Sequence, residues 1–428
     1  MQNVNLFEHQ ESRVRSYCRT FPVVFSKSKD SQLFDENDKS YIDFLSGAGA
    51  LNYGHNNDVI KNAVIEYLES DGILMSLDLH TKAKRDFLHV FQNNILDPRD
   101  LHYKIQFTSP TGTSVIESAV KLARKFTKRE NIICFTNAFH GMTGVSLSLT
   151  GSNHHRQNHA YSQVSRFPFE GYLGNETDSI AYYRKLLTDP SSGIDLPAAV
   201  IVETIQAEGG LNVASVKWLQ ELRRMTEELG ILLIIDDIQA GCGRSGAFFS
   251  FERASIKPDL VCLSKSIGGI GMPFAILLID DKLDIWSPAE DNGTFRGNNL
   301  AFVAATSMIK HYWGDTKFEV RLKEFSEYIT QRLDNIVHKY PLLLVQRKGI
   351  GFMQGIQFRE PAVAEYVVNQ CFAAGLVIER CGPIDEVLKL MPALTISKEL
   401  LDRGIDIVES TLKKLVIQTP SQIEIADC

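Results

Sequence analysis

Five short, continuous apolar runs in the middle of the chain constrain its fold more than any other feature. They are NIICFTN (131–137), AAVIVET (198–204), ILLIIDD (231–237), LVCLS (260–264) and FAILLID (274–280). Runs of this kind are typical of parallel strands that are covered on both faces. Helical patterns lie between them, over residues 113–129 and from a predicted N-cap at Ser215 to Gly230. The alternation predicts an α/β fold with a large, mostly parallel sheet and helices on both sides.

The two ends of the chain differ from this middle part. Residues 22–46 contain short hairpin-like segments, and from Tyr312 onward long helices alternate with further strands. We expect both ends to form one small α/β domain beside the large one. The predicted bounds are 1–62 and 313–428 for the small domain and 63–312 for the large domain.

Length and composition narrow the class of protein. A chain of 428 residues is too long for one simple core. A net charge of −7 argues against a general nucleic-acid surface. Apolar runs stay well short of the about 18 residues that span a membrane, and the N-terminus lacks a signal-peptide pattern. Seven scattered cysteines fit a reduced, cytoplasmic chain better than a disulfide framework.

Lys265 is the first candidate for chemistry, because it stands between an apolar run and a glycine turn in VCLSKSIGG (261–269). Burial would lower the pKa of its amine and make it a nucleophile. Asp236 ends the apolar run that precedes it, 29 positions before Lys265, which is about the distance along the chain from one strand to the next. Pyridoxal phosphate chemistry requires such a pair: a lysine that forms a Schiff base with the aldehyde and a carboxylate that keeps the pyridine nitrogen protonated. The pair predicts an aminotransferase.

Two further segments could hold this cofactor. Gly112 and Thr113 stand where a loop becomes a helix, and the free N–H groups there bind phosphate well. The alternative is that Thr113 merely caps the helix. Phe139 could supply the flat face on which the ring stacks, and His140 with its neighbouring glycine could allow close approach to the ring. The alternative is that Phe139 belongs to the core and His140 is a satisfied polar residue.

Other polar motifs carry weaker signals. Glu203 and Glu208 in ETIQAEGG follow a strand and could tune charge or gate a substrate carboxylate; the alternative is a pair of solvated loop acids. Thr294 in DNGTFRGNN could hold phosphate. A patch of three histidines is more typical of a polar loop than of a metal site, so we assign no metal; its members are His154, His155 and His159.

The segment GCGRSG (241–246) matches the dinucleotide-binding fingerprint letter for letter. That motif opens directly from a strand into a helix of about a dozen residues. Here Asp237 to Ala240 separate the strand from the first glycine, and the following residues lack a helical apolar stripe. A nicotinamide-dependent dehydrogenase therefore stays as the alternative from a different chemistry.

Taken together, SKSIGGIGMP, DDIQAGCGRSG, PTGTS, FHG, NGTF and ETIQAEGG resemble the class III, or ω-, aminotransferases, which are fold-type I pyridoxal phosphate enzymes. The resemblance implies that Lys265 forms the Schiff base, that Asp236 pairs with the pyridine nitrogen and that Gln239 faces the ring oxygen. Further cofactor-binding residues that it implies are Gly112, Thr113, Phe139, His140, Glu203 and Thr294. It places Thr294 on the phosphate of the partner subunit, which implies a homodimer or a higher homo-oligomer.

Over residues 10–415 the chain resembles the diaminobutyrate branch of that family, which serves the ectoine pathway. Enzymes of this branch move an amino group from glutamate to the aldehyde of aspartate 4-semialdehyde, so the implied partners are small-molecule substrates. The implied substrate-binding residues are Glu208 and Lys389, although lysine lacks the bidentate fork of the arginine that many ω-aminotransferases have there. Ornithine, 4-aminobutyrate or another ω-amine as substrate, and a racemase, decarboxylase or aminomutase on the same fold, remain alternatives.

Overall fold

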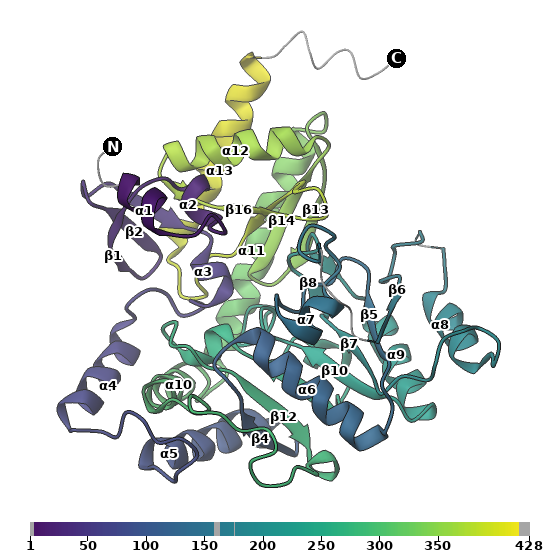
Figure 1. The fold of residues 1–428 in the computed structure, drawn as a ribbon. Coiled ribbons are helices and arrows are strands. Elements are labelled where there is room, and N and C mark those ends of the chain that lie inside the picture. The colour runs from purple at the N-terminus through teal and green to yellow at the C-terminus, as the bar shows by residue number, and fades with distance from the viewer. Residues whose placement is uncertain (1–3, 158–162, 175, 419–428) are drawn as a thin grey trace.

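A computed structural model describes residues 4–157, 163–174 and 176–418 (Figure 1). Its largest sheet has seven strands in the order β4-β12-β11-β10-β7-β5-β6. The strands are β4 (Tyr103–Phe107), β5 (Ile132–Phe135), β6 (Val164–Phe167), β7 (Ala199–Val202), β10 (Leu232–Asp236), β11 (Leu260–Leu263) and β12 (Ile276–Asp280). All five predicted apolar runs are strands of this sheet, and the sheet is mostly parallel as predicted.

One strand runs against the others. β12 is antiparallel to both β11 and β4. The run 274–280 is therefore a strand, but its expected parallel direction is wrong. The physical reason is the connection from β11, which contains only the one-turn 3-10 helix Lys265–Gly268. Parallel neighbours are usually joined by a crossover that contains a full helix, and the connection over residues 264–275 has none.

Helices cover the sheet on both faces. α6 (Gly112–Thr127) packs its apolar side, which includes Val115 and Ala119, against one face. α9 (Val216–Glu228) packs Trp218 and Leu222 against the other face, and its N-cap is Ser215 as predicted. Alternate residues of each central strand join the two cores, so the strands are apolar along their whole length.

Strands from opposite ends of the chain share a second sheet in the order β1-β2-β3-β15. Its strands are β1 (Phe25–Lys29), β2 (Gln32–Asp35), β3 (Ser40–Asp43) and β15 (Leu376–Val377). Ile42 lies opposite Leu376 in a parallel pairing. Figure 1 shows these N-terminal strands next to α12 (Pro361–Ala373) and α13 (Lys398–Gln418), so the two chain ends combine as expected.

A third sheet, β13-β14-β17-β16, lies between the second sheet and the large one. Its strands are β13 (Leu344–Ile350), β14 (Met353–Phe358), β16 (Glu379–Cys381) and β17 (Val387–Leu390), and a two-stranded ribbon adds β8 (Ile205–Gln206) and β9 (Asn212–Val213). The remaining long helices are α4 (Asp58–Glu69), α5 (Lys82–Phe91), α8 (Ser179–Thr188), α10 (Asn299–Tyr312) and α11 (Lys317–Lys339). Within the described residues, every helix is too short or too polar to cross a membrane.

Candidate active site

Lys265 and Asp236 lie at the ends of neighbouring strands. Asp236 is the last residue of β10 and stands opposite Cys262 of β11, three positions before Lys265. Lys265 begins the 3-10 helix with φ of 52°, and no described residue forms a hydrogen bond or ion pair with its Nζ. Burial lowers the pKa of this amine, although Glu208 and other nearby carboxylates act against the shift. The structure therefore brings the predicted pair together and leaves the amine unpaired.

A buried histidine holds the carboxylate of Asp236. The Nδ1 atom of His140 lies 2.7 Å from Oδ2 of Asp236, and the backbone N–H of Ile238 donates to Oδ1 at 3.2 Å. Both side chains are almost fully buried. The Nε2 atom of His140 has no hydrogen-bond partner in the described part of the chain. His140 thus orients the carboxylate, a contact that the sequence did not indicate.

Phe139 and Glu203 are also joined. Glu203 follows β7 directly, and its Oε1 accepts the backbone N–H of Phe139 at 2.9 Å. Burial, and then the charge of Asp236, raise the pKa of Glu203 well above its ordinary value. The ring of Phe139 is half-buried and lies 6.0 Å from the ring of His155. Phe139 is therefore a ring held in place at the edge of the site rather than a core residue.

The N-terminus of α6 lies beside these residues. Its N-cap is Thr111, whose side chain accepts the N–H of Ser114 at 3.2 Å, so the alternative that Thr113 caps the helix is wrong. A Cβ on Gly112 would lie 3.2 Å from the side chain of Ile238, close to Asp236 in sequence. The start of this 16-residue helix, where the first N–H groups have no partner within the helix, therefore lies against Ile238, two residues after Asp236.

The hydroxyl of Thr113 forms part of a small polar cluster. It bonds to Thr143 at 3.0 Å and also to Ser146. Gly141 lies against it with φ of 130°, and a Cβ there would come within 2.5 Å of the Thr113 hydroxyl. A side chain at position 141 would displace this hydroxyl, which explains the glycine after His140.

Lys389 sits fully buried between two carboxylates. On β17 its Nζ lies 2.8 Å from Oε1 of Glu208 and 3.0 Å from Oε1 of Glu379, which is its direct neighbour on β16. Burial opposes the charged form, but Glu208 and Glu379 raise the pKa of Lys389 well above its usual value. Against the opposing effect of burial, Lys389 and Lys265 lower the pKa of Glu208 to about 2. The alternative of solvated loop acids is wrong for both Glu203 and Glu208.

This cluster extends on both sides. The side-chain amide of Gln239 donates to Glu208 at 3.1 Å and to the carbonyl of Ala48 at 2.8 Å. At the other side, the hydroxyl of Tyr17 donates to Oε2 of Glu379 at 3.2 Å. Sequence reasoning missed Tyr17, Glu379 and the loop around Ala48. The only local signal was the glycine-rich SGAGA at residues 46–50.

That loop contacts the lysine segment directly. The hydroxyl of Ser266 donates to the carbonyl of Gly49 at 2.6 Å and accepts the N–H of Asn52 at 3.1 Å. Gly49 has φ of 87°, and a Cβ there would lie 3.2 Å from the side chain of Gln239. This loop, which belongs to the N-terminal part of the chain, therefore covers Lys265 and Gln239.

Thr294 lies apart from this cluster, and the histidine patch only borders it, through the contact between His155 and Phe139. Thr294 is exposed in the loop between β12 and α10 and is not among the residues joined by these contacts. His154 and His155 are neighbours on the surface, while His159 lies outside the described residues. In the described ranges there is no group of three His, Cys, Asp or Glu residues that could hold a metal ion.

The GCGRSG segment does not open a helix. Residues 237–251, all of which the structure describes, form turns and bends after β10. Arg244 is fully buried there, and its guanidinium donates to Oδ1 of Asn52 and to the carbonyls of Phe352 and Pro392. The fingerprint thus lacks the helix that binds a dinucleotide pyrophosphate.

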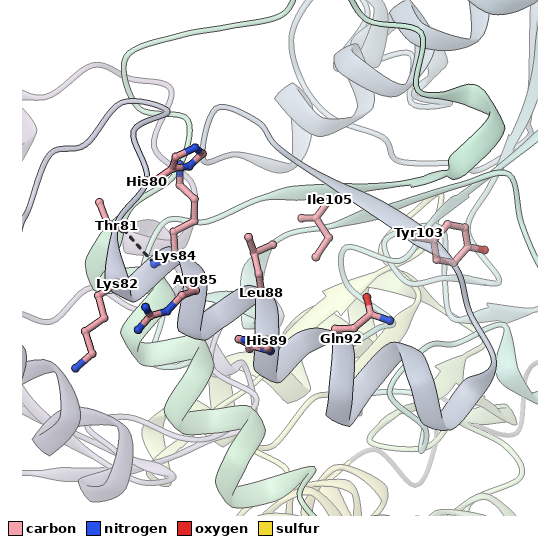
Figure 2. Close-up of a pocket in the computed structure, with 10 residues that line it drawn as sticks. All are labelled: His80, Thr81, Lys82, Lys84, Arg85, Leu88, His89, Gln92, Tyr103 and Ile105. Carbon is pink, nitrogen blue, oxygen red and sulfur yellow. Dashed lines mark hydrogen bonds between the residues drawn. The ribbon is translucent and has the colours of Figure 1, made fainter.

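A groove of about 750 Å³ lies elsewhere, along α5 and β4 (Figure 2). Its walls carry the cations Lys82, Lys84 and Arg85 and the apolar side chain of Leu88. Lys84 donates to the backbone carbonyls of Asp78 and Leu79. None of the site residues described above lines this groove.

Comparison with known proteins gives three consistent matches. A family model described as aminotransferase class III matches residues 14–412. The diaminobutyrate–2-oxoglutarate transaminase of Vibrio parahaemolyticus is 50% identical over 414 residues, covering 96% of this chain and 98% of that protein. The protein of the same name from Virgibacillus pantothenticus is also 50% identical, over 96% of this chain and all of its own length.

Solved structures with low sequence identity share the fold. The ornithine aminotransferase of Toxoplasma gondii superposes with a TM-score of 0.84 at 21% identity, over 97% of this chain and 95% of that one. An S-selective transaminase from Bacillus megaterium gives a TM-score of 0.86 at 20% identity, over 99% of both chains.

Proposed function

The chain belongs to the class III aminotransferases, and from this premise we propose that it transfers the amino group of L-glutamate to L-aspartate 4-semialdehyde. The products are 2-oxoglutarate and L-2,4-diaminobutyrate, and the reaction is reversible. The observation that carries the proposal is 50% identity with the diaminobutyrate–2-oxoglutarate transaminase of Vibrio parahaemolyticus over 96% of the chain. Family membership itself confirms the predicted enzyme class and the fold-type I α/β fold.

The cofactor of this family is pyridoxal 5′-phosphate, and the described residues fit it. It supplies an electron sink that stabilises negative charge on the substrate carbon bearing the amine. Its aldehyde needs an amine with a lowered pKa and without a partner, as Lys265 is. Its pyridine nitrogen needs a buried carboxylate, as Asp236 is, and its phosphate needs free N–H groups, as the start of α6 offers.

The chain's own residues then have separate tasks. Lys265 would hold the cofactor in the resting enzyme. Once the substrate amine has displaced it, the freed Nζ would take the proton from the substrate carbon that bears the amine. Asp236, oriented by His140, sustains positive charge on the pyridine nitrogen. Glu203 fixes the backbone of Phe139, whose ring would stack on the cofactor.

The remaining predicted residues bind the periphery. Gly112 and Thr113 would hold the phosphate at the start of α6, and Gln239 would face the ring oxygen. Glu208 and Lys389 face the far end of the substrate. A substrate carboxylate would bind the ammonium of Lys389 in place of Glu208, which lies 2.8 Å from it.

We also propose that two copies form a homodimer in which Thr294 of one copy reaches the phosphate in the other. Support comes from exposed apolar residues on the Thr294 loop and on the segment that it contacts. Asn292 donates to Asp78 at 3.4 Å, so the Thr294 loop lies against the segment 73–79. Half or more of each of these apolar residues is exposed: Ile73, Leu74, Met75, Leu77, Leu79 and Phe295.

Mixing two inactive variants tests the homodimer. Lys265→Ala and Thr294→Ala copies are unfolded and refolded together. A mixed dimer then has one site with both residues native, so activity rises above that of either variant refolded alone. Equal activity in mixed and separate samples would show that each site is built from one copy.

Three further points belong to the same proposal. Residues 1–62 and 313–428 form the small domain and residues 63–312 the large one. The diaminobutyrate that the enzyme makes serves the ectoine pathway. The enzyme works in the cytoplasm, which agrees with the free thiols of the described cysteines Cys18, Cys134, Cys242, Cys262, Cys371 and Cys381.

A panel of amine donors tests the reaction. The holoenzyme is incubated with 2-oxoglutarate and either L-2,4-diaminobutyrate, L-ornithine or 4-aminobutyrate, and glutamate is measured by mass spectrometry. We expect the highest kcat/KM with diaminobutyrate. A higher value with ornithine or 4-aminobutyrate, or glutamate formation from none of them, would overturn the proposal.

A further inference from the structure

Resting on the proposed function, we propose that Glu379 is a specificity-determining residue that binds the 2-ammonium group of diaminobutyrate and of aspartate 4-semialdehyde. Glu379 lies on β16, directly opposite Lys389 on β17. Its side chain is 9% exposed, while that of Glu208 is 31% exposed. A carboxylate this deeply buried needs partners for both of its oxygens.

One oxygen of Glu379 is left incompletely satisfied. Its Oε2 accepts the hydroxyl of Tyr17 at 3.2 Å. Its Oε1 is 3.0 Å from Nζ of Lys389, but this oxygen has no hydrogen-bond partner of acceptable geometry among the described residues. The ammonium of Lys389 instead donates to Glu208 at 2.8 Å. Oε1 is therefore a buried acceptor that shares one ammonium with Glu208 and lacks a well-aligned hydrogen bond of its own.

The charges of the cluster point to a cationic donor. One buried ammonium, that of Lys389, faces two carboxylates, those of Glu208 and Glu379. Lys389 and Glu208 already neutralise each other, so an ionised Glu379 leaves one negative charge in excess. Burial raises the pKa of Glu379, and the charge of Glu208 adds to this rise, while Lys389 and Lys265 oppose it. A second ammonium brought by the substrate would remove the excess charge.

The substrate has such an ammonium in the right relation to the reacting group. Diaminobutyrate reacts through the amine on C4 and carries its second ammonium on C2. A chain of contacts joins the Lys265 end of the site to Glu379. A Cβ on Gly49 would lie 3.2 Å from the side chain of Gln239 and 4.0 Å from that of Lys265. Gln239 donates to Glu208. Lys389 pairs with both Glu208 and Glu379. A substrate attached at the Lys265 end can therefore extend along this chain of residues toward Glu379. By contrast, 4-aminobutyrate has no ammonium on C2 and gains nothing from Glu379.

L-Glutamate, the amino donor of the proposed reaction, presents a different group to Glu379. L-Glutamate reacts through its own 2-amine, so the end that reaches Glu379 is a carboxylate. Two carboxylates then face each other, and the charge of Glu379 opposes binding. Removing that charge should therefore weaken the diaminobutyrate complex and leave the glutamate complex unchanged or tighter.

The test compares Glu379→Gln with wild-type holoenzyme and with Glu365→Gln, which changes a 62% exposed glutamate on α12. A charge-assisted hydrogen bond in a buried site corresponds to an affinity change of about 10-fold to 100-fold. We expect Glu379→Gln to raise KM for diaminobutyrate at least about 10-fold at similar kcat. KM for 4-aminobutyrate and glutamate stays within about 2-fold or falls, and Glu365→Gln changes none of them.

Inhibition constants measure the contact with the 2-ammonium group without transfer of an amine at C4. L-Homoserine has the 2-ammonium but a hydroxyl in place of the C4 amine, and 4-hydroxybutyrate lacks both nitrogen groups. In the wild type, homoserine should inhibit at least about 10-fold more strongly than 4-hydroxybutyrate. In Glu379→Gln this preference should disappear.

The outcomes separate the two proposals. If wild-type enzyme does not use diaminobutyrate at all, the proposed function fails. If it does, but Glu379→Gln changes all substrates equally or none, Glu379 only holds Lys389 and the inference fails alone. Should Glu379→Gln not fold, the same ratios are measured for Glu379→Asp, which moves the charge back by one methylene. Ratios equal to those of the wild type would again overturn the inference.

Discussion

Replacing Arg244 by methionine tests how strongly one buried cation ties the active-site loop to the rest of the chain. Its guanidinium donates twice to Oδ1 of Asn52, at 3.0 and 2.6 Å, and to the carbonyl of Phe352 at 3.1 Å. It also donates to the carbonyl of Pro392. Asn52 belongs to the loop that covers Lys265, while Phe352 and Pro392 come from the C-terminal part of the chain.

The magnitude follows from the acceptors that methionine leaves behind. Three buried oxygens lose their donor, and each unsatisfied buried acceptor costs about 1–3 kcal/mol. Burial lowers the pKa of Arg244 to about 9, so removing the charge also relieves a desolvation penalty and offsets part of this loss. The low end of the range, about 3 kcal/mol in total, is therefore the expected destabilisation.

Calorimetry measures this as a change of Tm. An unfolding entropy of about 2.1 cal/mol/K per residue gives roughly 0.9 kcal/mol/K for 428 residues, so Arg244→Met should lower Tm by about 3 °C. The control is Arg85→Met, because Arg85 is 66% exposed and pairs only with its neighbour Asp86 among the described residues. Exposed changes of this kind stay within about 0.5 kcal/mol. If Arg244→Met and Arg85→Met have the same Tm, the reasoning is refuted.

Three other predictions concern the site. Lys265→Ala should abolish transamination and leave no cofactor fixed by borohydride in the mass spectrum, while Lys348→Ala, another lysine whose pKa burial lowers, should keep both. Asp236→Asn should lower kcat by at least about 100-fold without changing the circular dichroism spectrum; a loss below 10-fold would contradict its role. Burial raises the pKa of Asp237 from 3.8 to about 7. As pH rises, the unfolded chain loses this proton near pH 3.8, whereas the folded protein keeps it until about pH 7. The folding stability contributed by the protonated carboxyl is therefore lost as pH rises between these two values. Tm of the wild type should thus fall more between pH 5 and pH 8 than Tm of Asp237→Asn, and parallel curves would rule this out.

The sequence predicted the parts of the structure that depend on local pattern. Buried strands are recognisable as apolar runs, and the carboxyl ends of adjacent parallel strands meet at one edge. Asp236 and Lys265 could therefore be paired from the sequence. The direction of β12 could not be predicted, because an apolar run has the same pattern in a parallel and in an antiparallel strand. Only the connection after Lys265, which lacks a full helix, determines it.

Contacts between distant segments left no pattern to find. Tyr17 and Glu379 lie at opposite ends of the chain, and each is one polar residue in an ordinary segment. Their meeting depends on how the two ends fold over the large sheet. The bond between His140 and Asp236 likewise depends on the path of the loop after β5, which no spacing encodes.

The pairing of β3 with β15 has a consequence for synthesis on the ribosome. The loop that covers Lys265 follows β3, and β3 gains its outer neighbour only when Leu376 and Val377 have been translated. A nascent chain contains all strands of the large sheet once Asp280 has been translated, but β3 can pair with β15 only after Val377. Prematurely terminated products would carry the lysine without its finished cover, so competence arises only in a chain translated nearly to its end.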